Sequence, residues 1–161
     1  MRNRPDVADL KQQLNAIGAD HVVTEEELRL PEMKNIFKEI PKPKLALNCV
    51  GGKNCSDMMR YVADKGYVIT YGAMSKQPVV ASATNLIFKD LTLKGFWRTL
   101  WAKEHSGSPE DDLMYNELEE LAIDKKLLPP KHTLHKLQDY RQAVQKSMEG
   151  FTSAKQILVN E

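Results

Sequence analysis

The stretch "LALNCVGGKNCSDMM", from Leu45 to Met59, decides the fold class. It joins a short apolar run to two glycines and then to an amphipathic segment. This order predicts a strand, a tight turn and a helix, which is the arrangement through which many proteins hold a phosphate group. The question is whether the glycines form such a phosphate loop or only turn the chain.

The two glycines do not complete a phosphate-binding motif. The dinucleotide fingerprint G-x-G-x-x-G needs three glycines, whereas after Gly51 and Gly52 the next glycine is Gly66. A P-loop needs a serine or threonine at the position where Asn54 stands. Taken locally, the pattern favours a tight turn, after which Asn54 or Ser56 can cap the helix.

Composition and charge limit the classes of protein that fit. The chain has 161 residues, of which 42% are hydrophobic and 28% charged, as expected for a soluble globular protein of one domain. Its 23 basic and 22 acidic side chains leave a net charge of +1, which provides no overall field for nucleic acid or a membrane surface. No apolar run reaches the roughly 20 residues that span a membrane, and the N-terminal residues do not follow a signal-peptide pattern. Cys49 and Cys55 are too few for a disulfide framework, so we expect free thiols in a reducing compartment.

Several segments have strand patterns. Leu45–Val50 and Tyr67–Tyr71 are almost continuously apolar, which predicts strands covered on both faces of a sheet. Leu91–Phe96 alternates and is therefore expected at a wetter face or a sheet edge. Two shorter strands are expected at His21–Thr24 and Gln156–Val159.

Apolar residues at helical spacing predict helices between these strands. Ser108 and Pro109 form a cap and a first-turn proline, so one helix should begin there. Strands alternating with helices predict βαβ crossovers, and hence the fold class α/β with a doubly wound parallel sheet. The predicted helices cover residues 5–18, 31–40, the segment that ends at Gly66, 108–126 and 137–148, the last stopping near Gly150.

A family resemblance rests on five stretches that run through nearly the whole chain. They are "RNRPDVADLKQQLNAIGADHVVTEEELRLPEMKNIF", "LALNCVGGK", "TYGAMSKQPVVA", "LIFKDLTLKGFW" and "SAKQILV". Together they resemble the C-terminal half of mitochondrial trans-2-enoyl-CoA reductases, which are enoyl thioester reductases of the medium-chain dehydrogenase/reductase superfamily. The resemblance is weakest between Thr99 and Gln138, whereas "KQPVVA" and "LKGFW" are specific to this branch.

The resemblance implies a reaction. In this family NADPH delivers a hydride to the β-carbon of a trans-2-enoyl thioester, and a proton goes to the α-carbon. The substrate would be an enoyl-CoA or enoyl-acyl carrier protein of mitochondrial fatty-acid synthesis, and no metal would take part. The resemblance also implies location in the mitochondrion. This expectation rests on the resemblance alone, because we find no targeting segment in the chain itself.

The resemblance also implies a truncated Rossmann-like domain. The first two strands, the glycine-rich turn and a domain with the catalytic tyrosine would lie outside the chain. Residues 1–161 would then be a partial NADP-binding domain whose tail, about 137–161, packs back on the catalytic domain. We therefore expect no catalytic residue in this chain and no turnover by it alone. The segment "CVGG" would be the turn after the fourth strand, beside the cofactor crevice.

The N-terminal basic segment is the first candidate cofactor contact. Arg2 and Arg4 flank Asn3 where the family carries a basic cluster facing the adenosine ribose. Guanidinium groups suit a 2′-phosphate, whereas an NAD site usually offers an acid to the ribose hydroxyls. The resemblance thus implies NADPH, bound by Arg2, Asn3 and Arg4. Without it, these would be solvated residues at a chain end.

Three further places match family contacts with the cofactor. They are the turn after the fifth strand, the segment after the sixth, and a lysine before the last strand. Gly72 would let the backbone approach a ring closely. Without the resemblance these are an ordinary turn, an aromatic pair of a core and a surface lysine. The residues are Tyr71, Gly72, Ala73, Met74, Phe96, Trp97, Arg98 and Lys155.

Other polar groups do not form a recognisable site. His132 and His135 lack a cysteine or carboxylate partner at metal-ligand spacing, so we expect surface residues and no metal. The acids at 110–112 would lie in the first turn of a helix, where the helix dipole already favours them.

Rival functions and a mode of assembly remain open from the sequence. The chain could be a quinone-reductase-like member of the same superfamily, or a non-catalytic truncated isoform that acts as an interaction module. The resemblance implies dimers that pair through the sixth strand, so we expect a homodimer or other self-association through Leu91–Phe96. Rearranged pairing of Leu45–Val50 is the alternative, because an apolar open strand edge is a template for another chain. We also expect Gln156–Val159 to lack a strand partner.

Overall fold

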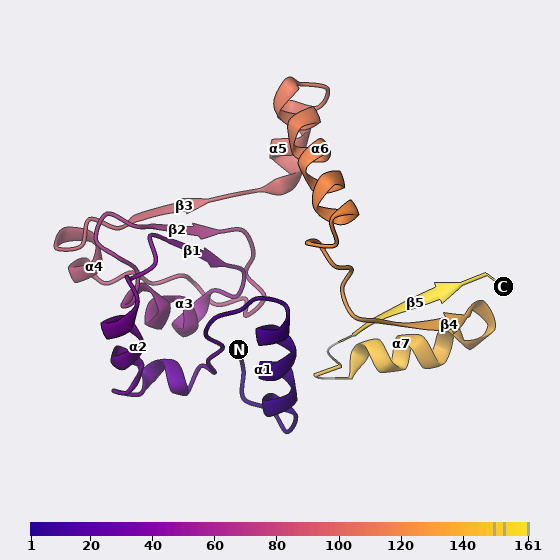
Figure 1. Cartoon of the computed structure of the whole chain (residues 1–161), viewed down its shortest axis with the longest axis horizontal. Helices are drawn as coiled ribbons and strands as arrows, with labels where there is room; N and C mark the ends of the chain where they lie inside the picture. The colour runs from indigo at the N-terminus through magenta and orange to yellow at the C-terminus, as the bar shows by residue number, and fades with distance from the viewer. Residues whose placement is uncertain (150, 153, 161) are drawn as a thin grey trace. The chain divides into compact units, whose positions relative to one another are not determined.

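The computed structural model describes residues 1–149, 151–152 and 154–160. These residues form two compact units, Met1–Glu104 and His105–Glu161. Figure 1 labels their helices and strands along the chain. Among the described residues, no helix is both long and apolar enough to cross a bilayer.

The first unit is built on a three-stranded parallel sheet. Its strands are β1 (Leu45–Asn48), β2 (Tyr67–Thr70) and β3 (Thr92–Gly95), in the order β1-β2-β3. Helix α3 (Gly52–Met59) connects the first pair of strands and helix α4 (Ala83–Ile87) connects the second. The predicted crossovers and parallel sheet are confirmed, and α4 is a helix that the sequence analysis missed.

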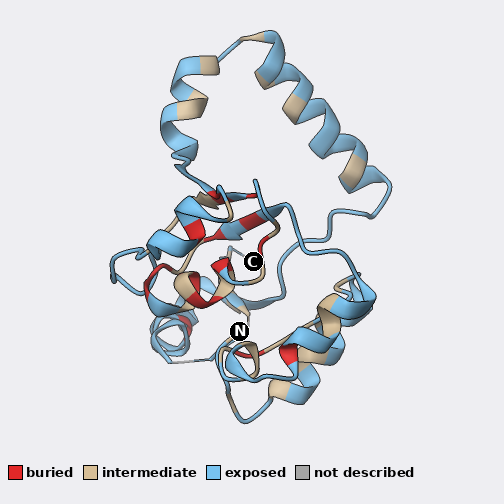
Figure 2. Cartoon of the chain, turned by 90° about the vertical axis from the view of Figure 1, so that its left-hand side faces the viewer, coloured by how far each residue is buried: buried red, intermediate tan, exposed pale blue. Residues whose placement is uncertain are grey.

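The core of this unit lies between the sheet and α3. Ala46 of β1 and Val68 of β2 are paired in the sheet and are both buried. Figure 2 colours buried residues red, and most of them lie in the first unit. Burial of this apolar surface is the main source of stability for the fold. The buried cluster consists of Ala46, Cys55, Met59, Val62, Val68 and Leu91.

The opposite face of the sheet is open. Leu45 and Leu47 of β1 keep 55% and 61% of their surface, and Tyr67 of β2 keeps 51%. The prediction that these strands are covered on both faces is therefore wrong for this chain. Crossovers between parallel strands are almost always right-handed, so consecutive strands in the order β1-β2-β3 are expected to have both connecting helices on the same side.

Three helical segments precede the sheet, namely α1 (Val7–Ala16), the 3₁₀ helix η1 (Glu27–Arg29) and α2 (Met33–Glu39). The predicted strand at His21–Thr24 is wrong, since the structure has no strand there. The Val23 carbonyl accepts a hydrogen bond from the amino group of Met1, and the Glu25 N–H donates to the Met1 carbonyl. These two bonds go to one residue, Met1, and a single residue cannot form the repeated hydrogen bonds of a β-sheet.

Helix α3 begins without a side-chain cap. Gly51 occupies the N-cap position at φ +78°, and no side chain accepts a hydrogen bond from the first turn. The prediction that Asn54 or Ser56 caps this helix is wrong, because both residues lie inside it. The Ser56 hydroxyl instead donates to the carbonyl of Val80.

Helix α6 (Pro109–Ile123) begins as predicted. The Ser108 hydroxyl oxygen accepts a hydrogen bond from the backbone N–H of Asp111. Helix α5 (Arg98–His105), which directly follows the segment after β3, was not predicted.

The second unit contains its own parallel pair of strands, β4 (His132–Lys136) and β5 (Lys155–Val159). The 3₁₀ helix η2 (Leu137–Asp139) and helix α7 (Tyr140–Met148) connect them. The final strand is confirmed, but the prediction that it lacks a partner is wrong because β4 pairs with it. The predicted helix end near Gly150 lies outside the described residues.

Candidate functional site

The carboxyl ends of β1, β2 and β3 lie at one edge of the parallel sheet, where open α/β sheets bind ligands. Asn48, only 3% exposed, ends β1 and holds this edge together. Its Oδ1 accepts hydrogen bonds from the N–H groups of Val50, at 3.2 Å, and Gly51, at 3.0 Å. Its Nδ2 donates to Thr70 Oγ1 of β2 at 3.0 Å. One buried side chain therefore shapes the turn after β1 and ties it to β2.

The turn after β2 is bonded to the turn after β1. The Met74 N–H donates to the Cys49 carbonyl at 3.1 Å, and the Ser75 N–H donates to the Val50 carbonyl at 2.9 Å. The Ser75 hydroxyl donates to the same Val50 carbonyl at 2.6 Å. The two turns thus form one continuous backbone surface, which we call the ledge, residues 49–54 and 71–77.

Glycines allow the two turns to approach this closely. Gly51 has φ +78° and Gly52 has φ +60°, which L-residues with side chains seldom adopt. A Cβ atom on Gly51 would lie 3.0 Å from the Gln77 carbonyl oxygen. A Cβ atom on Gly72 would lie 3.0 Å from the Cys49 carbonyl oxygen. The glycines therefore serve the contact between the turns.

Both cysteines are free thiols, as predicted. Burial raises the pKa of the Cys55 thiol in the core, which keeps it protonated. On the ledge, the hydrogen bond to Cys49 raises the pKa of the Tyr71 phenol, and the charge of Cys49 acts in the same direction. Because its pKa is raised, the Tyr71 phenol is protonated at neutral pH, and 53% of the residue's surface is exposed on the ledge.

A cavity of about 600 Å³ lies against the ledge. Three of its lining residues, Arg2, Arg29 and Lys53, are cationic, and one, Glu25, is anionic. This balance favours a ligand with more than one negative charge. The lining residues are Met1, Arg2, Glu25, Arg29, Val50, Gly51, Gly52, Lys53, Asn54, Met74, Ser75 and Gln77.

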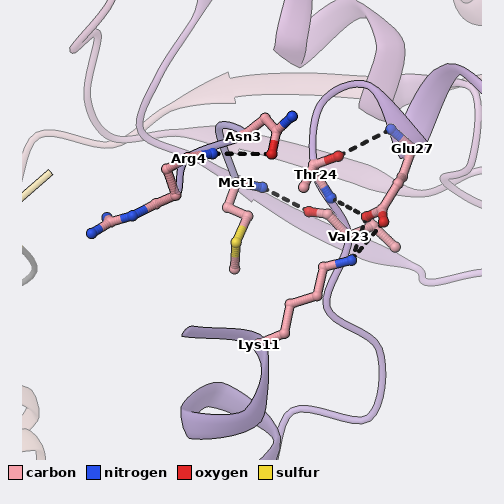
Figure 3. A network of polar contacts seen from close by, with 7 residues as sticks. All are labelled: Met1, Asn3, Arg4, Lys11, Val23, Thr24 and Glu27. Atoms are coloured by element: carbon pink, nitrogen blue, oxygen red, sulfur yellow. Dashed lines mark hydrogen bonds and ion pairs between the residues drawn. The ribbon is translucent and has the colours of Figure 1, made fainter. Parts of the chain in front are cut away.

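A polar network holds the basic N-terminal segment in place (Figure 3). Met1 and Arg2 of this segment line the cavity at the ledge. The amino group of Met1 donates to the Val23 carbonyl at 2.8 Å. Next to it, the Thr24 N–H donates to Glu27 Oε2 at 2.7 Å, and the Glu27 N–H donates to Thr24 Oγ1 at 3.1 Å. These reciprocal bonds form a capping box.

Lys11 of α1 fastens this network to the first helix. Its Nζ lies 2.6 Å from both carboxylate oxygens of Glu27. The hydrogen bond from Lys11 lowers the pKa of the Glu27 carboxyl, and the Thr24 N–H adds to this effect. Because the folded pKa is lowered, the contribution of this pair to stability is present at neutral pH and is lost as the pH falls through that pKa.

The structure brings only part of the predicted basic cluster to the cavity. Arg2 lines it. Arg4 is not among the lining residues, and its guanidinium pairs with Asp6, with Nη2 at 2.9 Å from Oδ2. Asn3 Oδ1 accepts a hydrogen bond from the Arg4 N–H at 3.0 Å. Figure 3 shows the Arg4 side chain directed away from Thr24 and Glu27.

The predicted turn lies on the ledge, and Met74 at its end lines the cavity with 82% of its surface exposed. Tyr71, Gly72 and Ala73 lead up to Met74 without lining the cavity. The structure places this segment beside the turn at Gly51, and its contact with a cofactor stays a prediction.

The remaining predicted residues do not line this cavity. Phe96 follows β3 and its N–H donates to the Thr70 carbonyl at 2.9 Å, so it stays at the same sheet edge. Trp97 is 67% exposed, and the Arg98 guanidinium lies 5.7 Å from the centre of the Trp101 ring. Lys155 belongs to the second unit, where it opens β5.

Sequence reasoning missed two residues that shape this site. Asn48 carried a usable signal, since asparagine at a strand end often bonds to N–H groups two and three residues ahead. Arg29 carried none, because its position depends on Asp57, which lies 28 residues later in the sequence and 2.7 Å away in space.

Comparison with known proteins identifies the class. Residues 6–109 match the family described as "Zinc-binding dehydrogenase", and the chain belongs to this family. The predicted fold class is confirmed by the parallel sheet and by this match.

Two curated relatives are similar over almost the whole chain. The human mitochondrial enoyl-[acyl-carrier-protein] reductase is 51% identical over 158 residues, which are 98% of this chain and 42% of that protein. The protein of the same name from Xenopus tropicalis is 47% identical over 161 residues, which are 99% of this chain and 46% of that protein. The chain thus spans less than half the length of these relatives.

Solved structures agree with these matches. A mutant of Etr1p in complex with NADP and crotonyl-CoA has a TM-score of 0.81 at 30% identity, covering 93% of this chain and 44% of that one. The mitochondrial 2-enoyl thioester reductase Etr1p/Etr2p heterodimer from Candida tropicalis also has a TM-score of 0.81 at 30% identity, covering 92% and 44%. A putative NADPH:quinone reductase from Bacillus thuringiensis, with a TM-score of 0.70 at 18% identity, covers 88% and 42% and shows a shared fold alone.

The family description names zinc. Within the described ranges, no three His, Cys, Asp or Glu side chains lie close enough together to hold a metal ion. The residues of these ranges therefore do not fit a zinc site.

The ledge should depend on Gly51 having no side chain. We expect Gly51→Ala to lower the free energy of unfolding of the first unit by about 1–3 kcal/mol, because alanine is strained at this φ and its Cβ meets Gln77. The matched control is Gly95→Ala, where a Cβ meets no atom within 4 Å and the change should stay within about 0.5 kcal/mol. Amide hydrogen exchange in β1 and β2 measures both, and equal effects would contradict the role assigned to Gly51.

Proposed function

We propose that this chain is part of an NADPH-dependent trans-2-enoyl-CoA or enoyl-acyl carrier protein reductase of mitochondrial fatty-acid synthesis. The observation that carries the proposal is the cationic cavity beside the glycine ledge, at the sheet edge where nucleotides bind. The names of the human and Xenopus tropicalis relatives support the activity and the mitochondrial location. The similar Etr1p mutant, a complex with NADP and crotonyl-CoA, supports the cofactor and the substrate class.

The residues of the cavity suit NADPH. Arg2 is a candidate partner for the 2′-phosphate, because a guanidinium forms paired hydrogen bonds with phosphate oxygens. We place the planar nicotinamide ring near Gly72, where the lack of a side chain would let the backbone approach the ring. When bound, the cofactor supplies a hydride to the enoyl thioester, while these residues hold and orient it. The proposed cofactor contacts are Arg2 and Met74, which line the cavity, together with residues that do not line it, namely Asn3, Arg4, Tyr71, Gly72, Ala73, Phe96, Trp97, Arg98 and Lys155.

The proposal assigns the chain a part of the whole reaction. Residues 1–161 would form part of the NADP-binding Rossmann-like domain, and the segment at about 137–161 would pack on the catalytic domain of the enzyme. The relatives are more than twice as long as the matched region, which supports a contribution from further sequence. We place no catalytic residue within this chain.

Cofactor preference tests the cavity. The sequence contains no three-glycine pyrophosphate turn, so we expect NADPH to bind in the millimolar range, or about −4 kcal/mol. Arg2→Gln should reduce the preference for NADPH over NADH about tenfold, because it removes one charged contact with the 2′-phosphate. The control Arg141→Gln, which removes a guanidinium from helix α7 in the second unit, should leave the preference unchanged. NMR titration with NADPH and with NADH measures the affinities of the unaltered chain and of both variants. Micromolar affinity of the unaltered chain for NADPH would contradict the expected weak site.

Turnover tests the assigned reaction. We expect the 161-residue chain alone to give no sustained oxidation of NADPH with crotonyl-CoA, and the longest natural form of the protein to give it. Absorbance of the reduced nicotinamide follows the reaction. Faster turnover of that form with a quinone than with crotonyl-CoA would point to a quinone reductase. Absence of turnover with either, together with specific capture of a full-length relative, would point to an interaction module.

Self-association is proposed through the edge strand β3, within Leu91–Phe96. The similar Etr1p/Etr2p structure is a heterodimer, which supports pairing of similar chains. Thr92 and Phe96 donate their N–H groups toward β2, so by strand alternation the Gly95 N–H faces the open edge. Gly95→Pro should therefore weaken a homodimer while keeping the bonds to β2.

Light scattering across a concentration series measures this assembly. We expect the unaltered chain to form dimers or larger species at high micromolar concentration, and Gly95→Pro to shift the transition about tenfold upward. A chain that stays monomeric throughout, or a proline variant that associates equally well, would rule out this edge.

A further inference from the structure

A second cavity of about 600 Å³ lies in the first unit, away from the ledge. Helix α2, the residues on either side of it and the residues just after α3 supply its walls. Arg29 is the one residue that the two described cavities share. The lining residues are Arg29, Leu30, Pro31, Lys34, Phe37, Lys42, Arg60 and Tyr61.

Half of these lining residues are cationic, and none of the described lining residues carries a carboxylate. Asp57 lies behind the wall with its side chain 2% exposed. Its Oδ2 is 2.7 Å from Arg29 Nε and its Oδ1 is 3.1 Å from Arg60 Nη2. One buried carboxylate therefore fixes two guanidinium groups in place and balances only one of their charges.

Two lysines add charge without a fixed partner. Among the described residues, neither Lys34 nor Lys42 forms an ion pair. Burial of Lys89 is the main cause that lowers the pKa of that residue, and the positive charge of Lys42 lowers it further. Negative charge lies near Arg29: the hydrogen bond to Asp57 raises the pKa of Arg29, and the charges of Glu25 and Glu26 add to this effect. The excess positive charge is therefore greatest at the side of the cavity formed by Lys34, Lys42 and Arg60.

The remaining wall is apolar and aromatic. The rings of Phe37 and Tyr61 are stacked, with centroids 5.2 Å apart and planes inclined by 22°. The Tyr61 hydroxyl donates to the Leu28 carbonyl at 2.9 Å, which fixes the ring. Leu30 and Pro31 complete this side. The aromatic wall and the cationic wall thus face the same small space.

We propose that this second cavity binds a nucleoside phosphate. The volume falls in the range of small-ligand sites, about 300–1,000 Å³, which favours a small molecule over a folded partner. The phosphate groups would be held by Lys34, Lys42 and Arg60, and the base would lie against the wall of Phe37 and Tyr61. The two cavities share Arg29 alone among their lining residues, and this proposal does not rest on the NADPH site.

Titration with ADP, followed by NMR of the whole chain, tests the proposal. We expect the double variant Lys34→Gln/Lys42→Gln to weaken ADP binding about fivefold or more, since it removes two charged contacts. The control Lys103→Gln/Lys146→Gln removes the same charge from helices α5 and α7 and should leave the affinity unchanged. Equal losses in both double variants would show unspecific attraction and overturn the proposal.

Two further variants distinguish the cavity and the base. Phe37→Leu should weaken ADP more than inorganic pyrophosphate, because only ADP has a base to stack. The NMR shifts that ADP causes at Phe37 and Tyr61 should persist in Arg2→Gln, since Arg2 lines the ledge cavity and not the second one. Loss of ADP binding in Arg2→Gln with retention in Lys34→Gln/Lys42→Gln would place ADP in the ledge cavity and overturn the proposal. Equal weakening of ADP and pyrophosphate by Phe37→Leu would overturn recognition of the base.

Discussion

The buried amide of Asn48 is the interaction on which the ledge depends. It accepts from two N–H groups of the turn after β1 and donates to the hydroxyl of Thr70 on β2. A polar side chain that is 3% exposed is stable only when its groups are bonded, and here three bonds satisfy it. Because the turn is held in this form, Gly51 and Gly52 can lie against Gln77 and the cavity has a fixed wall.

The arrangement of the sheet explains why the cavity lies where it does. Parallel strands direct all their carboxyl ends to one edge, so the segments after β1, β2 and β3 collect there without any direct sequence link. The buried cluster around Met59 and Val68 keeps the strands in register behind that edge. Arg29 reaches the cavity from another direction, anchored by the buried carboxylate of Asp57.

Much of the fold could be predicted because the signals were local. The apolar run at Leu45, the cap at Ser108 and the spacing of the helices all depend on neighbouring residues. The strand predicted at His21–Thr24 failed because a β-branched run forms a strand only when another strand lies beside it. Arg29 and Asp57 could not be linked for the same reason, since their contact joins separate segments. Among the predicted site residues, the turn that ends at Met74 could be located because it follows an apolar strand pattern, and its contact with a cofactor stays a prediction. The pairing of Arg4 with Asp6 depends on side-chain geometry that no pattern encodes.

The strand pair of the second unit has a consequence for how the chain opens. Among its described residues, Ala143 alone is buried, so β4, β5 and α7 have almost no apolar interior. The backbone hydrogen bonds of β4 and β5 form a ladder, but few buried apolar side chains keep water away from it. Such a segment has a small free energy of local opening and exposes its amides long before the first unit unfolds. A surface that covered the exposed side chains of β4, β5 and α7 would stabilise this strand pair. The rate at which the amides of the pair exchange would then report whether that surface is bound.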